Sequence, residues 1–472
     1  MGESARLFLA VAALAFLLRL PFLDAGYGWD SDAWRVASAA AAMVETGNYT
    51  APRLPGNPVH DVAMAFLWSL GPAGRTPLAL NGASALVSAL GAGAFALAWR
   101  RVGAPDPGLA GLAAASVPAV FVASVSTMDY AFGFGFVAIA VAFALHGRGA
   151  PALAFAALAL GSRLSSAIAL PAIGAILLAR AGRWPTTREV AGAGAMVVFW
   201  ALVGLLPYLP LWLERGAAAL TWYDHGYPSL SLVVKKATVD LWGWPGFLAW
   251  IAAAMAGVVR LVRWGLRPPA ASVDPVPVIA AGVSGAAGAA WLRLPYKAAY
   301  LVPAVPFLLL AHAHAVPRSA LRVLLVALCL SPWVLSVYAR EDTPPPQGLA
   351  REVRVAGQAF VVDVRGPILL DHETRKADLV YGTRVAAATG SLPPGSAVVV
   401  QDWLPMLRVL TGVVRGPLEK DGVLHTHLVD QAELDRLRRE RRALYYLPGV
   451  DVANRSRFGV DLAAAGARPL VP

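Results

Sequence analysis

The sequence predicts a polytopic α-helical membrane protein of about 11 transmembrane helices, followed by a C-terminal soluble α/β domain. Of its 472 residues, 57% are hydrophobic and only 15% are charged, whereas roughly a quarter of a soluble globular protein is charged. The mean hydropathy is +0.58. Apolar runs near the roughly 20 residues that cross a bilayer recur along the first three quarters of the chain, and later runs shrink to strand length.

The basic character of the chain is explained by membrane topology. The formal net charge is +11, which would also suit a protein that binds nucleic acid. However, the basic residues form short clusters in loops between apolar runs, as they do in cytoplasmic loops of membrane proteins. We therefore exclude nucleic acid as a partner and expect membrane lipids instead. Cys329 is the only cysteine, so no intrachain disulfide is expected in a domain outside the cell.

Ten apolar stretches make up the predicted membrane part. Residues 151–180 are too long for one helix and too short for two full spans, so we expect a hairpin of two short helices with Arg163 at its apex. The first run contains Arg19 and lacks a clear small-x-small cleavage site, so we expect an uncleaved helix. The runs expected to span once are 7–23, 78–99, 109–125, 128–145, 190–213, 241–262, 275–292, 298–313 and 321–338.

Basic residues also predict the orientation of the chain. A cytoplasmic N-terminus places Arg100, Arg148, Arg180 and Arg260 in inner loops, as the positive-inside rule requires. An odd number of spans then places the C-terminal domain on the extracytoplasmic side. Frequent Ala, Gly, Arg and Pro suggest a GC-rich bacterial genome, so the expected location is the bacterial cytoplasmic membrane.

Two domains are predicted. Residues 1–340 form the transmembrane domain, whose first outer loop covers 24–77, and residues 341–472 form the small α/β domain after the Pro-rich linker "REDTPPPQG". In that second domain "GPILLDH", "SAVVVQD" and "RALYYLPG" are typical of strands, and "RKADLVYGTRVAAATG" and "DQAELDRLRRERR" of helices. His425 and His427 are expected in a solvated loop, since no partner at metal-ligand spacing accompanies them.

The first outer loop carries the most informative residues. In "GYGWDSDAW" (26–34), Asp32 is expected to cap a surface helix that begins near Ala33. The run "VHDVAMAFLWSLGP" suits an interfacial or re-entrant helix. Asp30 and Asp32 together would also suit a solvated turn and a helix cap. However, Asp61, Asp129 and Arg163 lie at or inside span ends, where an ionised group is costly and is usually functional or paired.

Four motifs, taken in order, resemble those of GT-C glycosyltransferases, in particular the lipid A aminoarabinose transferases and protein O-mannosyltransferases. They are "DSDAWRVASAAAAMVETGNY", "STMDYAFGFGF", "LALGSRLSSAIALPA" and "RLPYKAAYLVPAVP". The resemblance covers most of residues 1–340. The chain departs from the family where Ala33, rather than Glu, follows Asp32, and where "GNPVHD" replaces a Lys-Pro-Pro segment.

The resemblance implies a reaction and its residues. Members of this family transfer a sugar, with inversion, from a polyprenyl-phosphate-linked donor to an acceptor hydroxyl, here of a lipid, a glycan or a protein. Asp32 then corresponds to the base, with Asp30 as the second candidate. The cations that hold the phosphate are Arg163 and Lys297, with Arg293 as a third. The other substrate-binding candidates are Arg53, Asp129, which is expected to pair with Arg163, and Tyr300.

Alternatives remain open at this stage. Arg163 would also suit a snorkelling arginine, and Lys297 an anchor in an aromatic belt. No cofactor is required, although a divalent metal ion held by His60, Asp61 and His225 is a hypothesis, weakened by the adjacency of two of these ligands. A multi-span transporter or lipid flippase would also use intramembrane charges, and a non-catalytic scaffolding subunit is the third alternative.

Overall fold

The structure is a computed structural model that describes residues 2–180, 183, 185–216, 218, 227–266, 275–339, 348, 350–355 and 358–472. The chain forms two compact units. Unit 1 consists of Met1–Leu23, Leu54–His60 and Asn81–His372; unit 2 consists of Asp24–Arg53, Asp61–Leu80 and Glu373–Pro472. Most of the first outer loop therefore belongs to the same unit as the C-terminal segment, a division that differs from the sequence-based boundary at residue 340.

Unit 1 is built mainly from helices. Among the described residues, four helical segments are long and apolar enough to cross a bilayer, and the bent pair α5 and α6 would make a fifth. The principal helices are α1 (Glu3–Leu17), α4 (Pro77–Arg101), α5 (Pro107–Ser116), α6 (Pro118–Ser124), α7 (Tyr130–Leu145), α8 (Gly149–Ser162), α9 (Ala169–Ala179), α10 (Thr187–Leu205), α11 (Leu209–Arg215), α12 (Leu230–Ala237), α13 (Val239–Leu266), α14 (Pro275–Trp291), α15 (Val305–Leu310) and α16 (Arg318–Leu330).

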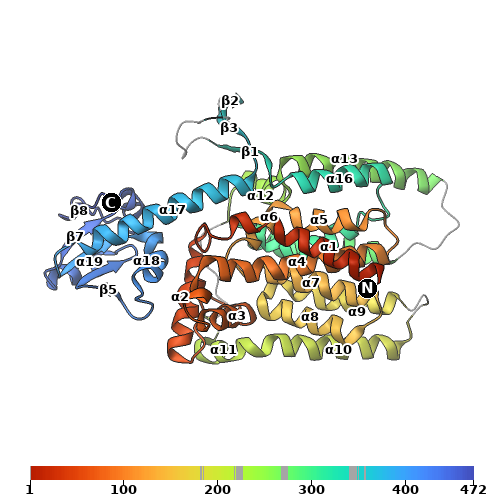
Figure 1. Cartoon of the computed structure of the whole chain (residues 1–472), viewed down its shortest axis with the longest axis horizontal. Helices are drawn as coiled ribbons and strands as arrows, with labels where there is room; N and C mark the ends of the chain where they lie inside the picture. Colours follow the sequence, from red (N-terminus) through yellow and green to blue (C-terminus); the bar gives the residue numbers. More distant parts are fainter. Residues whose placement is uncertain are drawn as a thin grey trace. The chain divides into compact units, whose positions relative to one another are not determined.

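The predicted hairpin over residues 151–180 is confirmed. Helix α8 ends at Ser162, Arg163 has an extended backbone (φ −164°, ψ 123°), and the short 3-10 helix η3 (Leu164–Ile168) leads into α9. This break places Arg163 at the turn between two short helices. The hairpin helix α8 lies beside α7 and α10, and these helices run side by side in Figure 1.

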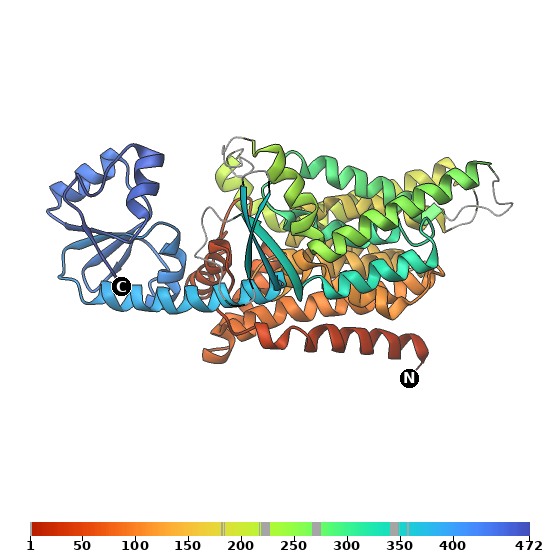
Figure 2. The same cartoon turned by 90° about the horizontal axis from the view of Figure 1, so that it is seen from above.

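The last predicted span, 321–338, is wrong in its second half. Helix α16 ends at Leu330, and Val334–Ala339 forms strand β1. That segment contains two valines and a tyrosine, residue types that favour a strand. β1 pairs antiparallel with β3 (Gln358–Arg365), which also pairs with β2 (Arg351–Val355), and Figure 2 shows these strands as a teal ribbon.

Unit 2 contains the helices of the first outer loop, α2 (Ser31–Thr46) and α3 (Pro58–Ser69), the latter shared with unit 1. It also contains a five-stranded sheet in the order β5-β6-β4-β7-β8. The strands are β4 (Ser396–Val399), β5 (Leu418–Lys420), β6 (Val423–Thr426), β7 (Ala443–Tyr446) and β8 (Arg468–Pro469). Unit 2 also contains helices α18 (Leu404–Thr411), α19 (Gln431–Arg439) and α20 (Val450–Phe458), and Figure 1 draws the sheet and these three helices in blue.

The predicted α/β pattern of the C-terminal segment is largely present. "SAVVVQD" contains β4, "RALYYLPG" contains β7, and α19 lies within the predicted helix, capped by Asp430. "GPILLDH", in contrast, is not a strand but opens helix α17 (Pro367–Gly390). Pro367 stands at its first position, where the missing N–H costs nothing. His425 is also not in a solvated loop, because it is buried in β6.

Candidate functional site

The first cluster of site residues lies in unit 2, at the start of α2. The sequence predicted Asp32 as the cap of a helix that begins near Ala33. Instead, α2 begins at Ser31 and Asp30 is its N-cap, with its carboxylate accepting the backbone N–H of Asp32 at 3.0 Å. An Asp cap satisfies one of the backbone donors that a helix start leaves open. Asp30 thus has a structural role, and the Asp32 side chain does not serve as the cap.

Asp32 is held as an ion-paired carboxylate. Its Oδ1 accepts from Arg35 Nη1 at 3.3 Å, one helical turn further along α2, and its Oδ2 pairs with Arg53 Nη1. The side chain of Asp32 is 14% exposed. Two guanidinium groups therefore orient both oxygens of this carboxylate, while part of it stays accessible. Arg53, which the sequence placed among the substrate-binding candidates, acts here as a direct partner of the candidate base.

The aromatic residues of "GYGWDSDAW" fix the entry into α2. Trp34 Nε1 donates to the carbonyl oxygen of Gly28 at 3.0 Å, and its ring meets the ring of Tyr27 edge-on, with 4.9 Å between centroids. Gly26 has a φ of +77°, and a Cβ there would lie 3.1 Å from the Trp34 ring. This tight turn requires glycine, and it sets the position of the acidic residues that follow.

The proposed metal ligands do not form a recognisable site in the part of the chain that the structure describes. Asp61 accepts a hydrogen bond from the Tyr49 hydroxyl at 2.8 Å, and the His60 ring meets Phe132 edge-on at 4.9 Å. Within the described ranges, no three His, Cys, Asp or Glu side chains are grouped as a metal ion would require. His225 lies outside the described residues.

The second cluster lies in unit 1 around Arg163. Its Nη1 pairs with Asp129, as the sequence predicted, and its Nε donates to Ser165 Oγ at 2.9 Å. The Asp129 and Arg163 side chains are 1% and 9% exposed. The guanidinium carbon lies 4.1 Å from the centre of the Tyr130 ring and 4.8 Å from that of Tyr300. Arg163 is therefore an ion-paired arginine between two aromatic faces, and not a snorkelling one.

The buried charges of this cluster are costly to maintain. A buried ion pair often gains little over an apolar pair, because both charges lose their hydration. The two cation–π contacts offset part of that cost. No hydrogen bond from Arg163 Nη2 is present among the described residues. This nitrogen of the guanidinium group is therefore available to an anionic oxygen. Arginine is well suited to phosphate, because its planar fork can donate two parallel hydrogen bonds.

The remaining basic candidates lie further along unit 1. Lys297 immediately precedes the 3-10 helix η6 (Ala298–Ala304), which carries Tyr300, and its carbonyl oxygen accepts from Trp291 Nε1 at 3.0 Å. The chain thus places Lys297 one turn before the aromatic face that covers Arg163. Arg293 is exposed. Sequence reasoning did not assign Tyr130 or Ser165 to the site, although Tyr130 directly follows Asp129, the acid chosen as the partner of Arg163.

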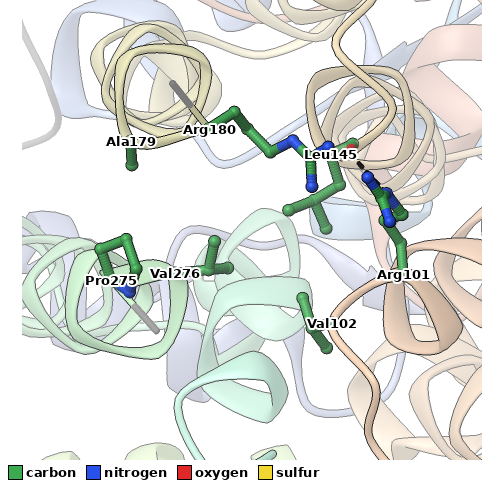
Figure 3. A pocket seen from close by; sticks show the side chains of 7 residues that line it. All are labelled: Arg101, Val102, Leu145, Ala179, Arg180, Pro275 and Val276. Carbon is green, nitrogen blue, oxygen red and sulfur yellow. Dashed lines mark hydrogen bonds between the residues drawn. The ribbon is translucent and has the colours of Figure 1, made fainter. Parts of the chain in front are cut away.

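Each unit also contains a cavity. In unit 1 a cavity of about 160 Å³ lies at the ends of α4, α7, α9 and α14. Figure 3 shows Arg101 and Arg180 reaching toward Leu145 there, and Arg101 Nε donates to the Leu145 carbonyl oxygen at 3.3 Å. Arg163 and Arg180 flank opposite ends of the η3–α9 segment, so this cavity is separate from the Arg163 cluster. The cavity of unit 2 is larger, about 230 Å³, and Arg35 lines it.

Comparison with known proteins identifies the fold. No family model matches the sequence, and no curated protein sequence matches it. The structure is similar to the crystal structure of ArnT from Cupriavidus metallidurans bound to undecaprenyl phosphate, with a TM-score of 0.53 and 17% sequence identity. The match covers 96% of this chain and 87% of ArnT. The chain therefore shares its fold with this GT-C transferase, which confirms at the level of the fold the resemblance seen in the four motifs.

Proposed function

We propose that this protein is a membrane glycosyltransferase that moves a sugar from a polyprenyl-phosphate donor to an acceptor hydroxyl, with inversion, at the outer face of the membrane. The observation that carries the proposal is the shared fold with ArnT over nearly the whole chain, since ArnT was crystallised with undecaprenyl phosphate. The acceptor is a lipid, a glycan or a protein. The Asp129–Arg163 and Asp32–Arg53 pairs supply the two kinds of charge that this reaction needs.

Arg163 is the proposed phosphate-binding cation. As the glycosidic bond to phosphate breaks, the electron pair and a growing negative charge go to the leaving phosphate oxygen. A fixed guanidinium stabilises that charge best when solvent reorganisation is avoided, and the Tyr130 and Tyr300 rings limit the movement of this one. Asp129 and Tyr300 act as positioning residues for Arg163. Lys297 is the second proposed phosphate ligand, and Arg293 the third.

Asp32 is the proposed base. The acceptor oxygen forms its bond to the anomeric carbon while its proton passes to an Asp32 oxygen, and polyprenyl phosphate leaves from the opposite face. General-base catalysis of this kind contributes about 10² to 10⁴ in rate. Arg53 and Arg35 orient the carboxylate. Asp30 is the less suitable candidate, because it accepts a backbone hydrogen bond as the cap of α2. The metal ion at His60, Asp61 and His225 stays a hypothesis, and no step of the proposal uses it.

The decisive experiment compares Asp32→Asn with Asp30→Asn. The purified full chain is incubated with a panel of polyprenyl-phosphate sugars and candidate acceptors, and products are identified by mass. Asp32→Asn should lose about 10² or more of turnover, whereas Asp30→Asn keeps most of it because Asn also caps helices well. Normal turnover by Asp32→Asn would overturn the assignment of the base.

A transporter or lipid flippase is the alternative from a different class. It would use the buried charge pair of unit 1 for transport, but it would form no new glycosidic bond. Mixing donor and acceptor in detergent, without a membrane to cross, therefore separates the two proposals. A sugar-bearing acceptor under those conditions requires an enzyme, and its absence for every donor in the panel would favour the transporter.

A further inference from the structure

The cavity of about 230 Å³ in unit 2 joins two distant parts of the chain. One wall is the face of α2 that carries Arg35, Ala39 and Ala42, and the opposite wall includes Arg408 of α18 and His427 after β6. Residues three or four apart share a helix face, and Asp32 belongs to the same face of α2. The proposed base thus lies next to the cavity, since Arg35 both lines the cavity and pairs with Asp32.

The side chains that line this cavity are cationic, polar or apolar, and no acidic side chain lines it among the described residues. Arg408 is half-buried, and burial lowers its pKa. Its Nη2 donates to the carbonyl oxygen of Gly416 at 2.8 Å and its Nη1 to that of Val413 at 3.4 Å. It makes no ion pair in the part of the chain that the structure describes. A partly desolvated guanidinium without a carboxylate partner favours binding of an anion.

The third polar group is His427. Its Nε2 lies 3.4 Å from Asp402 Oδ1, and Asp402 is not itself a lining residue. The imidazole can therefore be oriented by a carboxylate behind it and still face the cavity. The rest of the lining is mostly apolar, with Ala39 and Ala42 from α2 and Pro405 from α18, and it includes the hydroxyl residues Ser38 and Thr50. Such a site suits a small ring with one charged substituent.

We propose that this cavity is the acceptor site, and that it takes a sugar-sized group that carries a phosphate or a carboxylate, bound by Arg35, Arg408 and His427. This inference rests on the proposed function. It gives the C-terminal α/β segment a role, because α18 and the end of β6 supply two of the three anion-binding groups. The ion pair between Arg415 and Glu45, at 3.2 Å, holds the same segment against α2.

Direct binding tests this inference without knowledge of the natural acceptor. The full chain in detergent is titrated with glucose 6-phosphate, glucuronate and glucose, and heat of binding is measured. Both anionic sugars should bind about tenfold or more tightly than glucose, since hydrogen bonds between charged groups are the strong ones. The tighter of the two anions identifies the charged group of the acceptor. Binding of glucose as tight as that of the anionic sugars would overturn the inference.

Variants connect the binding to the cavity. Arg408→Gln and His427→Gln should each weaken the binding of glucose 6-phosphate about tenfold, and Ala42→Leu should weaken it by filling the space without removing a charge. Arg457→Gln, on the exposed side of α20, is the control and should bind as the wild type does. Unchanged affinity in both Arg408→Gln and Ala42→Leu would place the anion elsewhere.

The test of this cavity can fail independently of the test of the proposed function. Asp32→Asn should lose transfer but still bind glucose 6-phosphate. If Asp32→Asn transfers sugar normally while Arg408→Gln loses probe binding, the base assignment fails and the cavity assignment stands. If Arg408→Gln and Ala42→Leu bind the probe normally while Asp32→Asn is inactive, only the cavity assignment fails.

Discussion

The carboxylate of Asp30 accepts the backbone N–H of Asp32 at 3.0 Å, so the first of the two neighbouring acids caps the helix that presents the second. The two residues are similar in sequence but differ in role. Asp30 is engaged with the backbone, whereas both oxygens of Asp32 face arginine side chains.

This relationship predicts that the stability of the chain depends on whether residue 30 can cap α2. Asp30→Ala should lower the free energy of unfolding by about 1 kcal/mol, the usual cost of a lost cap, whereas Asp30→Asn should leave it nearly unchanged. Thermal unfolding of the full chain in detergent measures both. Equal stability of Asp30→Ala and the wild type would show that the cap does not matter.

The aromatic faces around Arg163 give a second prediction. Tyr300→Leu removes one face from the guanidinium, and cation–π contacts at desolvated sites are worth about 2 kcal/mol. We expect a rise of about tenfold in the KM for the polyprenyl-phosphate donor, with a smaller effect on kcat. Tyr300→Phe keeps the ring and is the matched control. A change in kcat alone would mean that Tyr300 does not act through donor binding.

Arg19 should stabilise unit 1 although it pairs with no acid in the described part of the chain. It is 1% exposed and donates to the carbonyl oxygens of Ala15 (2.6 Å) and Ala115 (2.7 Å) and to Ser124 Oγ (2.6 Å). Ala115 lies in the last turn of α5, just before the 69° bend to α6, where helical carbonyls lose their partners.

Arg19→Leu should therefore lower the free energy of unfolding by about 2 kcal/mol or more, because each buried acceptor left open costs about 1–3 kcal/mol. Arg6→Leu, at an exposed position of α1, the helix that ends shortly before Arg19, is the control and should change little. Denaturant titration in detergent measures the difference. Similar stability of both variants would contradict a role for Arg19 at the bend.

Close contact between α4 and α7 gives a fourth prediction. A Cβ on Gly91 would lie 2.6 Å from the Cα of Gly135, whereas a Cβ on Gly82, in the same helix α4, would have nothing within 4 Å. Gly91→Ala should cost about 1–3 kcal/mol through overpacking, whereas Gly82→Ala should be neutral or slightly stabilising. Thermal unfolding of the two variants compares them directly, and a stabilising Gly91→Ala would show that the helices can separate freely.

The pH dependence of stability should reveal the partner of His427. A hydrogen bond from His427, together with the charges of His427 and Arg35, holds the pKa of Asp402 below its usual value. A depressed carboxyl pKa stabilises the folded state above the unfolded pKa of about 3.9, and this contribution is lost as pH falls through the lower, folded value. The effect should be small, because the Asp402 side chain is 65% exposed.

Asp402→Asn should accordingly lower the Tm at neutral pH, and the difference from the wild type should disappear once the pH has fallen below the lowered pKa of the folded state. The measurement is the Tm of both full chains across this range. A difference that persists in acid would have to come from the shape of the side chain and not from its charge.

Much of the site could be inferred from local sequence, but the role of each acid could not. A charged residue at the end of an apolar run needs a partner, and this argument correctly paired Asp129 with Arg163. The contacts of Tyr130 and Tyr300 with Arg163 could not be predicted from the sequence, because aromatic residues are common at span ends for other reasons. The sequence also predicted Asp32 as the helix cap, whereas Asp30 is the cap in the structure. Helix starts predicted from sequence are uncertain by one or two residues.

The sequence by itself determined that most of the first 330 residues are apolar helices, that the hairpin is broken at Arg163 and that an α/β pattern follows residue 372, because these features follow from the length and periodicity of hydrophobic runs. Only the tertiary structure decided that residues 334–339 form a strand, which requires β3 as a partner. It alone showed that α2 packs with α18 around a cation-lined cavity. Contacts between residues hundreds of positions apart depend on how the surfaces of helices and strands pack together. The local sequence pattern does not determine this packing.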